Sequence, residues 1–430
     1  MTRRHLLLGS LFAGVLSTAY ATEPPKPERF VLDGGAELLV FPDPHATSAA
    51  LAALVRLGPE DEGTEQGVAA LLAHLVGTEA EGRGATQIQR DVEEFGAIGS
   101  EYDGLGLTLW AVSDPMAFDE AARTLLVNVL ARPTIAPDAF AAARDDMNRA
   151  LQRQSEDLFH LTIDGLRSRV FGTSISLLGT ERSLAALTPA KVEAFHERVV
   201  RPSRTTLIAA GKLEPEAVRK QVSALLGAAG WLELSAAPKP RPVSPLAPLP
   251  VLRDLELPVH APATSVALGL LWPGLNASDI QRVWPACVLL DSLLGGGKGA
   301  RLFKVLRDKE SLGYEVNTEL VPGRGASLWA AYMVGNAPVG AMKERLRGAV
   351  ADAAKGNFTE EELNRARAYL NGQRLRREQR LLGKVRALAS DLSIGLDPLT
   401  PRLTDSISLD EINSLARQLL STNPALVHSL

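Results

Sequence analysis

Four short segments from the first half of the chain recur in the same order in its second half. The members of each pair share a pattern of apolar and polar residues, and their starting positions differ by 217 to 223 residues. The pairs are SAALAALVRLG from Ser48 with SVALGLLWPG from Ser265, TLWAV from Thr108 with SLWAA from Ser327, APDAFAAAR from Ala136 with TEEELNRAR from Thr359, and LTPAKVEAF from Leu187 with ISLDEINSL from Ile407. Four collinear matches at a nearly constant offset indicate two copies of one domain.

A proline-rich segment separates the two copies. Residues 233–250 read ELSAAPKPRPVSPLAPLP, with six prolines and no periodic apolar pattern. Proline fixes φ and lacks a backbone donor, so the segment is expected to be an extended linker. The prediction is therefore an N-terminal domain over residues 22–232 and a C-terminal domain over residues 251–430.

Patterning within each copy predicts an α+β fold. FVLDGGAELLVFPD, which begins at Phe30, has the alternation of a hairpin around a glycine turn, and ALAALVRLG and GLTLWAVS are further strand candidates. TPAKVEAFHERVV begins with a capping Thr188, has Pro189 in its first turn and keeps helical spacing; the strand candidate TTLIAAG follows it. Because no regular βαβ alternation is present, each domain is expected to pack helices against a mixed or antiparallel sheet.

Composition excludes several classes of protein. With 46% hydrophobic and 22% charged residues, the 430-residue chain has the composition of globular domains. A net charge of −4 and an aromatic content of 5% argue against a nucleic-acid-binding surface. Cys287 is the only cysteine, which excludes an intrachain disulfide and a cysteine-based zinc site.

The N-terminus has the pattern of a secretory signal peptide over residues 1–21. Two arginines precede an apolar run from Leu6 to Ala19, and small residues allow cleavage near Ala21. The run is short for a membrane span, and no other segment has 18 uninterrupted apolar residues. We therefore expect a periplasmic or secreted protein without a membrane span. TRRHLLL also resembles a twin-arginine signal, so the export route stays open between that pathway and the general secretory one.

A helix rich in alanine and leucine carries a single histidine. The segment GVAALLAHLVGT, residues 67–78, resembles the zinc helix of the pitrilysin/insulinase family of peptidases, whose inverted motif is His-x-x-Glu-His. In that frame His74 matches the second histidine, whereas Ala70 stands in place of the first and Ala73 in place of the catalytic glutamate. The family's third ligand, a glutamate on a later helix, corresponds to Ala150. The resemblance extends over nearly the whole mature chain.

One imidazole cannot hold a catalytic zinc, and no glutamate remains to deprotonate water. We therefore expect no metal in this chain and interpret His74 as a structural remnant. The alternative is a weak metal site that recruits nearby carboxylates such as Glu65, Glu79 and Glu81, which fall near or beyond the ends of the helix.

The second copy retains a different motif. LLGGGKGARLFKVLRDKESLGYEV, residues 293–316, resembles the signature of the family's second domain, in which an arginine and a tyrosine seven residues apart grip the substrate backbone. Here they are Arg307, near the end of an expected helix, and Tyr314, at the start of an expected strand. The glycines 295–299 are expected to form a flexible loop, and they lack the spacing of a phosphate-binding loop. The alternative is that Arg307 is a solvated helix residue and Tyr314 a packed strand residue.

Within the resembled family, some peptidases are split over two chains, one with the zinc motif and one without it. The loss of the motif here, with Arg307 and Tyr314 present, predicts the non-catalytic, substrate-binding subunit of a heterodimeric zinc peptidase. Its partner would be a homologous subunit that carries the motif and the zinc, and its substrates would be peptides. Two alternatives remain: a scaffold or binding protein without a catalytic partner, and a peptidase with unrecognised metal ligands.

Overall fold

The computed structural model describes residues 26–80, 83–171, 176–236, 253–259, 263–275, 279–400 and 403–429. The predicted signal peptide and residues 237–250 of the predicted linker lie outside these ranges. No helix among the described residues is long and apolar enough to cross a membrane.

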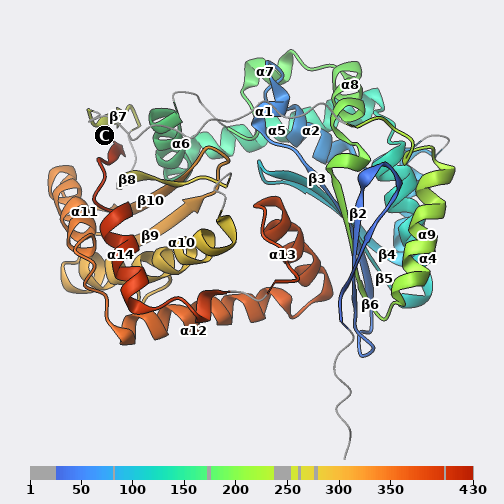
Figure 1. Cartoon of the computed structure of the whole chain (residues 1–430). Coiled ribbons are helices and arrows are strands. Elements are labelled where there is room, and N and C mark those ends of the chain that lie inside the picture. The colour runs from blue at the N-terminus through green and yellow to red at the C-terminus, as the bar shows by residue number, and fades with distance from the viewer. Residues whose placement is uncertain are drawn as a thin grey trace, which may run out of the picture.

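Two mixed sheets form the framework (Figure 1). The first has the strand order β1-β2-β6-β3-β5-β4 and the second the order β7-β11-β8-β10-β9. The strands of the first sheet are β1 (Glu28–Val31), β2 (Glu37–Pro42), β3 (Ala49–Arg56), β4 (Gly96–Tyr102), β5 (Gly106–Ser113) and β6 (Thr205–Gly211). Those of the second are β7 (Leu255–Leu257), β8 (Thr264–Pro273), β9 (Glu315–Val321), β10 (Ala326–Gly335) and β11 (Ala425–Ser429).

The two sheets repeat one topology. In each, a single parallel pair, β2 with β6 or β7 with β11, adjoins a run of antiparallel strands. The segments that recur in the sequence occupy corresponding strands: β3 matches β8, and β5 matches β10. The α+β fold with two homologous halves is therefore confirmed. The expected hairpin is β1 and β2, joined by the turn Asp33–Gly35, and the expected helix after Thr188 begins at Pro189.

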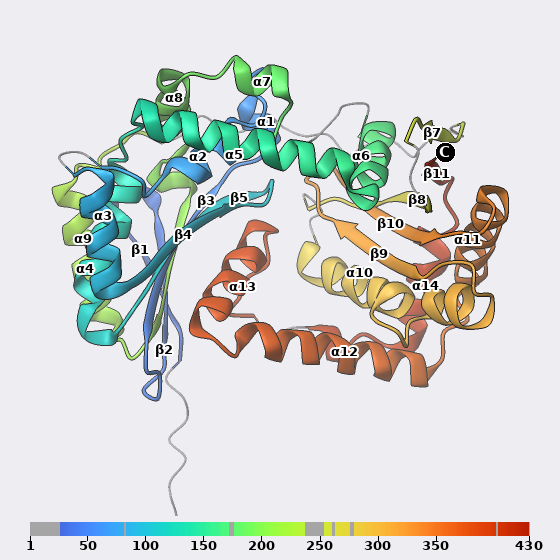
Figure 2. The same ribbon diagram turned by 180° about the vertical axis from the view of Figure 1, so that it is seen from behind.

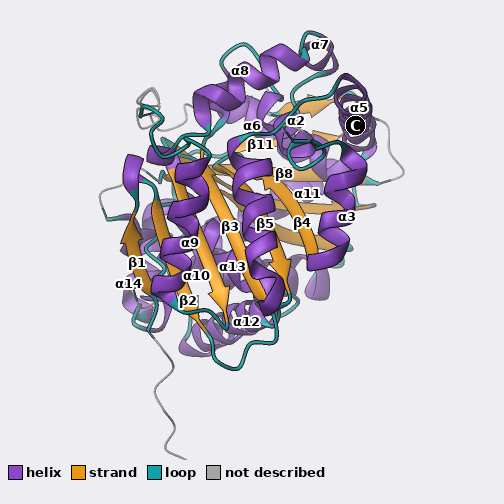
Figure 3. Ribbon diagram, turned by 90° about the vertical axis from the view of Figure 1, so that its right-hand side faces the viewer, coloured by secondary structure: helices purple, strands orange, loops and turns teal. Residues whose placement is uncertain are grey.

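Helices cover the sheets on both sides. Those of the first half are α1 (Pro59–Glu62), α2 (Val68–Leu75), α3 (Ala85–Phe95), α4 (Phe118–Arg123), α5 (Pro137–Glu156), α6 (Leu158–Phe171), α7 (Glu181–Ala185), α8 (Pro189–Val199) and α9 (Pro215–Ala228), with a π-helical segment η3 (Thr124–Ala131). Those of the second half are α10 (Ile280–Gly295), α11 (Val339–Ala353), α12 (Glu360–Glu378), α13 (Leu381–Ser393) and α14 (Leu409–Leu419), with a π-helical segment η5 (Phe303–Lys309). Short 3₁₀ turns are η1 (Asp33–Gly35), η2 (Pro115–Ala117), η4 (Pro202–Arg204) and η6 (Leu403–Asp405). Figure 3 shows the first sheet broadside behind α9 and α3.

Each half lends one helix to the other. Helix α5 runs from the first half into α6, which packs on the second sheet, and α12 runs from the second half into α13, which packs on the first (Figure 2). In the first sheet, alternate residues such as Leu51 and Ala52 face opposite cores, the latter shared with Leu388 and Leu392 of α13. Because strands such as β3 are buried on both faces, they read as unbroken apolar runs in the sequence.

Candidate functional site

Helix α2 carries the residues that correspond to the lost zinc motif. Ala70 and Ala73 are buried, whereas the side chain of His74 is exposed. The Nδ1 atom of His74 donates to the carbonyl oxygen of Ala70 at 2.9 Å, so one ring nitrogen is already bonded to its own helix. Helix α5, which carries the half-buried Ala150, packs against α2.

These residues do not fit a catalytic zinc. Three alanines supply no ligand and no base, and among the described residues no three histidine, cysteine, aspartate or glutamate side chains cluster so that they could hold a metal. Of the carboxylates considered from the sequence, Glu65 and Glu79 belong to no such cluster, and Glu81 lies outside the described residues.

A buried glutamate that the sequence analysis did not single out caps α2. The Glu62 carboxylate accepts hydrogen bonds from the backbone N–H groups of Gly67 and Ala69, at 3.0 and 3.3 Å. It is 5% exposed, and burial raises its pKa to about 7 despite these bonds. Helix N-termini leave N–H groups unsatisfied, and an acidic residue shortly before the helix is the signal that points to this cap.

Arg307 and Tyr314 meet where η5 turns into β9. A guanidinium N–H of Arg307 donates to the backbone carbonyl oxygen of Tyr314, and the guanidinium also lies 5.0 Å from the centre of the Phe303 ring. Both side chains are exposed, Tyr314 to 53%. Together with residues 311–313 and 335–337 they line a shallow pocket of about 600 Å³. The structure thus brings the predicted pair together, while His74 lies in the other half of the molecule.

The turn between Arg307 and Tyr314 is tightly constrained. Ser311 has a φ of 54°, and among the described residues it is the only one other than glycine with a positive φ. For a residue with a side chain that conformation costs free energy, and such strain is concentrated at functional sites. The backbone N–H of Leu312 donates to the carbonyl oxygen of Leu306, and Glu310 forms an ion pair with Arg345 of α11. The turn is thereby tied to the elements on both sides.

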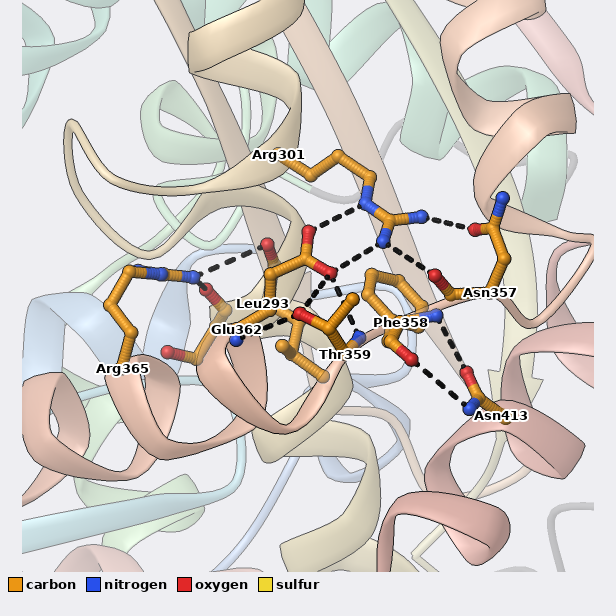
Figure 4. Close-up of polar contacts among 9 residues, drawn as sticks. Leu293, Arg301, Asn357, Phe358, Thr359, Glu362, Arg365 and Asn413 are labelled. Carbon is orange, nitrogen blue, oxygen red and sulfur yellow. Dashed lines mark hydrogen bonds and ion pairs between the residues drawn. The ribbon is translucent and has the colours of Figure 1, made fainter.

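The N-terminal part of α12 holds residues 295–299, the glycine loop, which precedes η5 (Figure 4). Arg301, at the start of the helical turn that leads to Arg307, forms a two-pronged ion pair with Glu362 at 2.9 and 2.7 Å and stacks on Phe358 at 4.0 Å. Arg365, one turn further along α12, donates to the carbonyl oxygens of Ser292 and Gly296 at the end of α10. Both ends of the loop are therefore bonded to one helix.

Close packing explains why this loop contains several glycines. A Cβ atom on Gly295 would lie 2.0 Å from the Thr318 hydroxyl, and one on Gly297 would lie 2.8 Å from the Tyr369 ring. Gly297 also has a φ of +78°. The sequence suggested flexibility, and the structure instead gives these glycines the role of letting the loop lie against β9 and α12.

Comparison with known families matches residues 186–370 to a domain described as the peptidase M16 inactive domain. The resemblance to the pitrilysin/insulinase family, which is family M16, is thereby confirmed. The matched range includes the glycine loop, Arg307 and Tyr314, and it begins after α2 and α5.

Similar proteins span almost the same length as this chain. An uncharacterized zinc protease of Mycobacterium leprae is 25% identical over 417 residues, which cover 91% of this chain and 89% of that protein. An uncharacterized zinc protease of Streptomyces coelicolor is also 25% identical, over 418 residues, which cover 93% of this chain and 88% of that protein.

Solved structures share the fold of this chain. The crystal structure of a peptidase M16 inactive domain from Pseudomonas fluorescens has a TM-score of 0.81 and 21% identity, with 94% of this chain and 98% of that chain covered. A protease from Helicobacter pylori has a TM-score of 0.82 and 17% identity, with 94% and 99% covered. At these identities the structural likeness establishes the fold.

Proposed function

We propose that this chain is the non-catalytic, substrate-binding subunit of an exported, heterodimeric zinc metallopeptidase that acts on peptides. A homologous partner subunit with an intact His-x-x-Glu-His motif would hold the zinc and activate the water. The observation that carries the proposal is the contrast between the two halves. The zinc frame on α2 retains only His74, whereas Arg307 and Tyr314 stand together and exposed at the start of β9.

The chemistry of the pair suits a peptide carbonyl. Arginine has five N–H donors, so the bond from Arg307 to the Tyr314 carbonyl leaves donors for a substrate, and the exposed Tyr314 phenol adds another. Such donors stabilise the negative charge that develops on a carbonyl oxygen during attack by water. Placed against a partner's zinc, they would orient and polarise the scissile bond without any metal in this chain.

A scaffold or binding function is the second candidate, and one observation favours it. The guanidinium of Arg307 already bonds to the main chain of its own turn and stacks on Phe303. These contacts would give Arg307 a role in holding the turn together even if it bound no substrate. Under that reading the loss of the zinc ligands would leave a peptidase fold with no peptidase partner.

Reconstitution with a zinc-motif homologue from the same genome distinguishes the two candidates. The purified chain is expected to bind no stoichiometric zinc and to hydrolyse no peptide alone, and the mixture is expected to hydrolyse a library of quenched fluorescent peptides. Arg307→Ala and Tyr314→Phe are each expected to lower kcat of the mixture about 100-fold, as losses of single oxyanion donors do.

Matched controls separate this role from folding. Lys304→Ala, an exposed change in the same helical segment, and Tyr369→Phe, an exposed tyrosine of α12, are expected to leave kcat unchanged. Unchanged turnover in both site variants would assign Arg307 and Tyr314 to packing and favour the scaffold. Stoichiometric zinc and chelator-sensitive hydrolysis by the isolated chain would instead support a peptidase with unrecognised ligands.

A further inference from the structure

A large groove lies between the first sheet and the corner that joins α12 to α13. This corner is at the C-terminal end of α12, whereas the glycine loop contacts its N-terminal part. The groove has a volume of about 1010 Å³. We call it the corner groove; its lining residues come from the β2–β3 loop (residues 43 and 45–48), from β4 and β5 (residues 97, 110 and 112), and from the corner itself (residues 375, 378–382 and 384). Its size is that of a site for a peptide segment rather than a single ion.

The corner concentrates positive charge on a chain whose net charge is negative. Between residues 374 and 386 six residues are basic and one, Glu378, is acidic. Three of the basic side chains are engaged: Arg374 with Glu378, Arg376 with Gln373, and Arg386 with Glu101.

Two cations of the corner groove lack a carboxylate partner in the described structure. They are Arg380, which is exposed, and Lys384, whose ammonium lies 5.8 Å from the Phe41 ring. From the facing loop the groove receives one carboxylate, Asp43, which accepts a hydrogen bond from the backbone N–H of His45, and the imidazole of His45. Glu378 also lines the groove, but its carboxylate is paired with Arg374. The other charged lining residues are Asp43, Arg380 and Lys384, and their net positive charge favours an anion.

Apolar side chains lie beside these cations. Leu375 is 54% exposed, and Trp110 and Val112 present partly buried surface from β5. An exposed apolar side chain inside a concave, charged site is a feature of binding surfaces. The occupant that matches both properties carries carboxylates and at least one apolar side chain.

The shape of the α12–α13 corner is determined by a glycine and by the packing of α13. A Cβ atom on Gly383 would lie 1.8 Å from the carbonyl oxygen of Arg377, so only glycine lets the chain fold back this closely between the two helices. The core beneath α13 then holds the corner against the first sheet through Val385 and Leu388. The packing of α13 on the first sheet therefore fixes the positions from which Arg380 and Lys384 extend into the groove.

We propose that the corner groove binds an extended acidic peptide segment that contains apolar residues. Arg380 and Lys384 pair with its carboxylates, and Leu375 and Trp110 pack against its apolar side chains. The concave shape and the apolar floor favour a peptide over a flat membrane surface or a nucleic-acid backbone. The site is separate from Arg307 and Tyr314, and binding requires neither zinc nor a partner subunit.

Fluorescence anisotropy on the isolated mature chain tests this site without any peptidase activity. The probe is a fluorescein-labelled peptide of sequence Gly-Glu-Leu-Glu-Ser-Glu-Leu-Glu-Gly, and the comparison peptides replace every glutamate by glutamine or every leucine by serine. We expect the acidic, leucine-containing probe to bind at least tenfold more tightly than either comparison peptide. Its affinity should fall as sodium chloride is raised, because salt screens exposed charges.

Charge-reversal variants locate the site. Arg380→Glu combined with Lys384→Glu is expected to weaken binding at least tenfold, and Leu375→Ser about fivefold, with unchanged circular dichroism. The matched control, Arg90→Glu with Lys220→Glu, reverses two exposed charges on α3 and α9 and is expected to bind as the wild type does. Equal loss in the control, or tighter binding of phosphatidylglycerol vesicles or single-stranded DNA than of the probe, would overturn the proposal.

Discussion

At the scale of single residues, burial decides what the histidines of this chain do. His196 of α8 is 8% exposed, and its Nε2 donates to the carbonyl oxygen of Leu130 at 2.9 Å. Burial lowers its pKa to about 4, since the charged imidazolium would lose its hydration. His196 is therefore a neutral core residue that links α8 to η3, and it is unavailable as a ligand or base.

The lowered pKa of His196 predicts a loss of stability in acid. Between pH 6.5 and pH 4 the unfolded chain binds a proton here and the folded chain does not, so the free energy of unfolding falls as the pH is lowered. We expect this residue to account for about 3 kcal/mol between pH 7 and pH 4. His196→Gln keeps a donor for Leu130 and removes the titration, so urea unfolding at both pH values should show a smaller loss for the variant.

A second histidine provides the control for this measurement. His45 is exposed, and His45→Gln is expected to give an unfolding free energy that follows the wild type across the same pH range. If the curves of His196→Gln and the wild type also run parallel, His196 is not held neutral by the fold.

The family resemblance made one pair of site residues predictable, whereas pairs formed by residues far apart in the sequence could not be predicted. Arg307 and Tyr314 were paired from the resemblance to the family's signature, and because they are seven residues apart across one helix-to-strand corner, a local turn is enough to bring them together. Arg301 and Glu362 are 61 residues apart, and nothing in either segment marks the other as its partner. Their ion pair depends on how α12 crosses the glycine loop, which is a property of the tertiary structure.

At the scale of elements, α12 is the part that organises the second half. Its first turn is capped by Thr359 and Glu362, and the same Glu362 carboxylate also holds Arg301. Asn413 of α14 bonds to the backbone of Phe358, just before the helix begins. The N-terminus of α12 thus contacts the glycine loop, the start of η5 and α14. Because Arg307 lies in η5, these contacts also determine the position of Arg307.

The Arg301–Glu362 pair is expected to contribute measurably to stability. The two side chains are only 14% and 25% exposed and form two parallel hydrogen bonds, so the pair should exceed an exposed ion pair in strength. We expect Arg301→Met and Glu362→Leu each to lower the free energy of unfolding by about 2 kcal/mol, with a coupling of about 1 kcal/mol in the double-mutant cycle.

An exposed ion pair of the same half serves as the comparison. Asp352 and Lys355 lie 2.8 Å apart with side chains 54% and 69% exposed. Their cycle is expected to give a coupling close to zero, because water and salt screen such pairs. A coupling at Arg301 and Glu362 no larger than this would mean that the pair does not fix the loop.

At the scale of the whole molecule, the boundary between the two sequence repeats is not the boundary between the two packed halves, because each repeat places one helix on the other repeat's sheet. The sequence shows two copies separated by a proline-rich segment, and the second sheet matches the first in strand order except that β1 has no counterpart in it. What the repeat cannot show is that α6 contributes Ile163, Leu166 and Val170 to the core of the second sheet, or that α13 covers the first. Apolar helix faces indicate burial, but they do not say against which sheet.

This exchange predicts that the two halves stay together without a covalent connection. Residues 22–241 and 242–430 expressed as separate chains, with an affinity tag on the first alone, are expected to co-purify in equal amounts and co-elute in gel filtration. Each fragment has an apolar helix that is buried only on the other's sheet, so separation would expose both faces to water. A second fragment that carries Val385→Asp and Leu388→Asp has charged residues on the buried face of α13, and its recovery with the first should fall sharply. Independent elution of the two complete fragments would show that the exchanged helices do not hold the halves together.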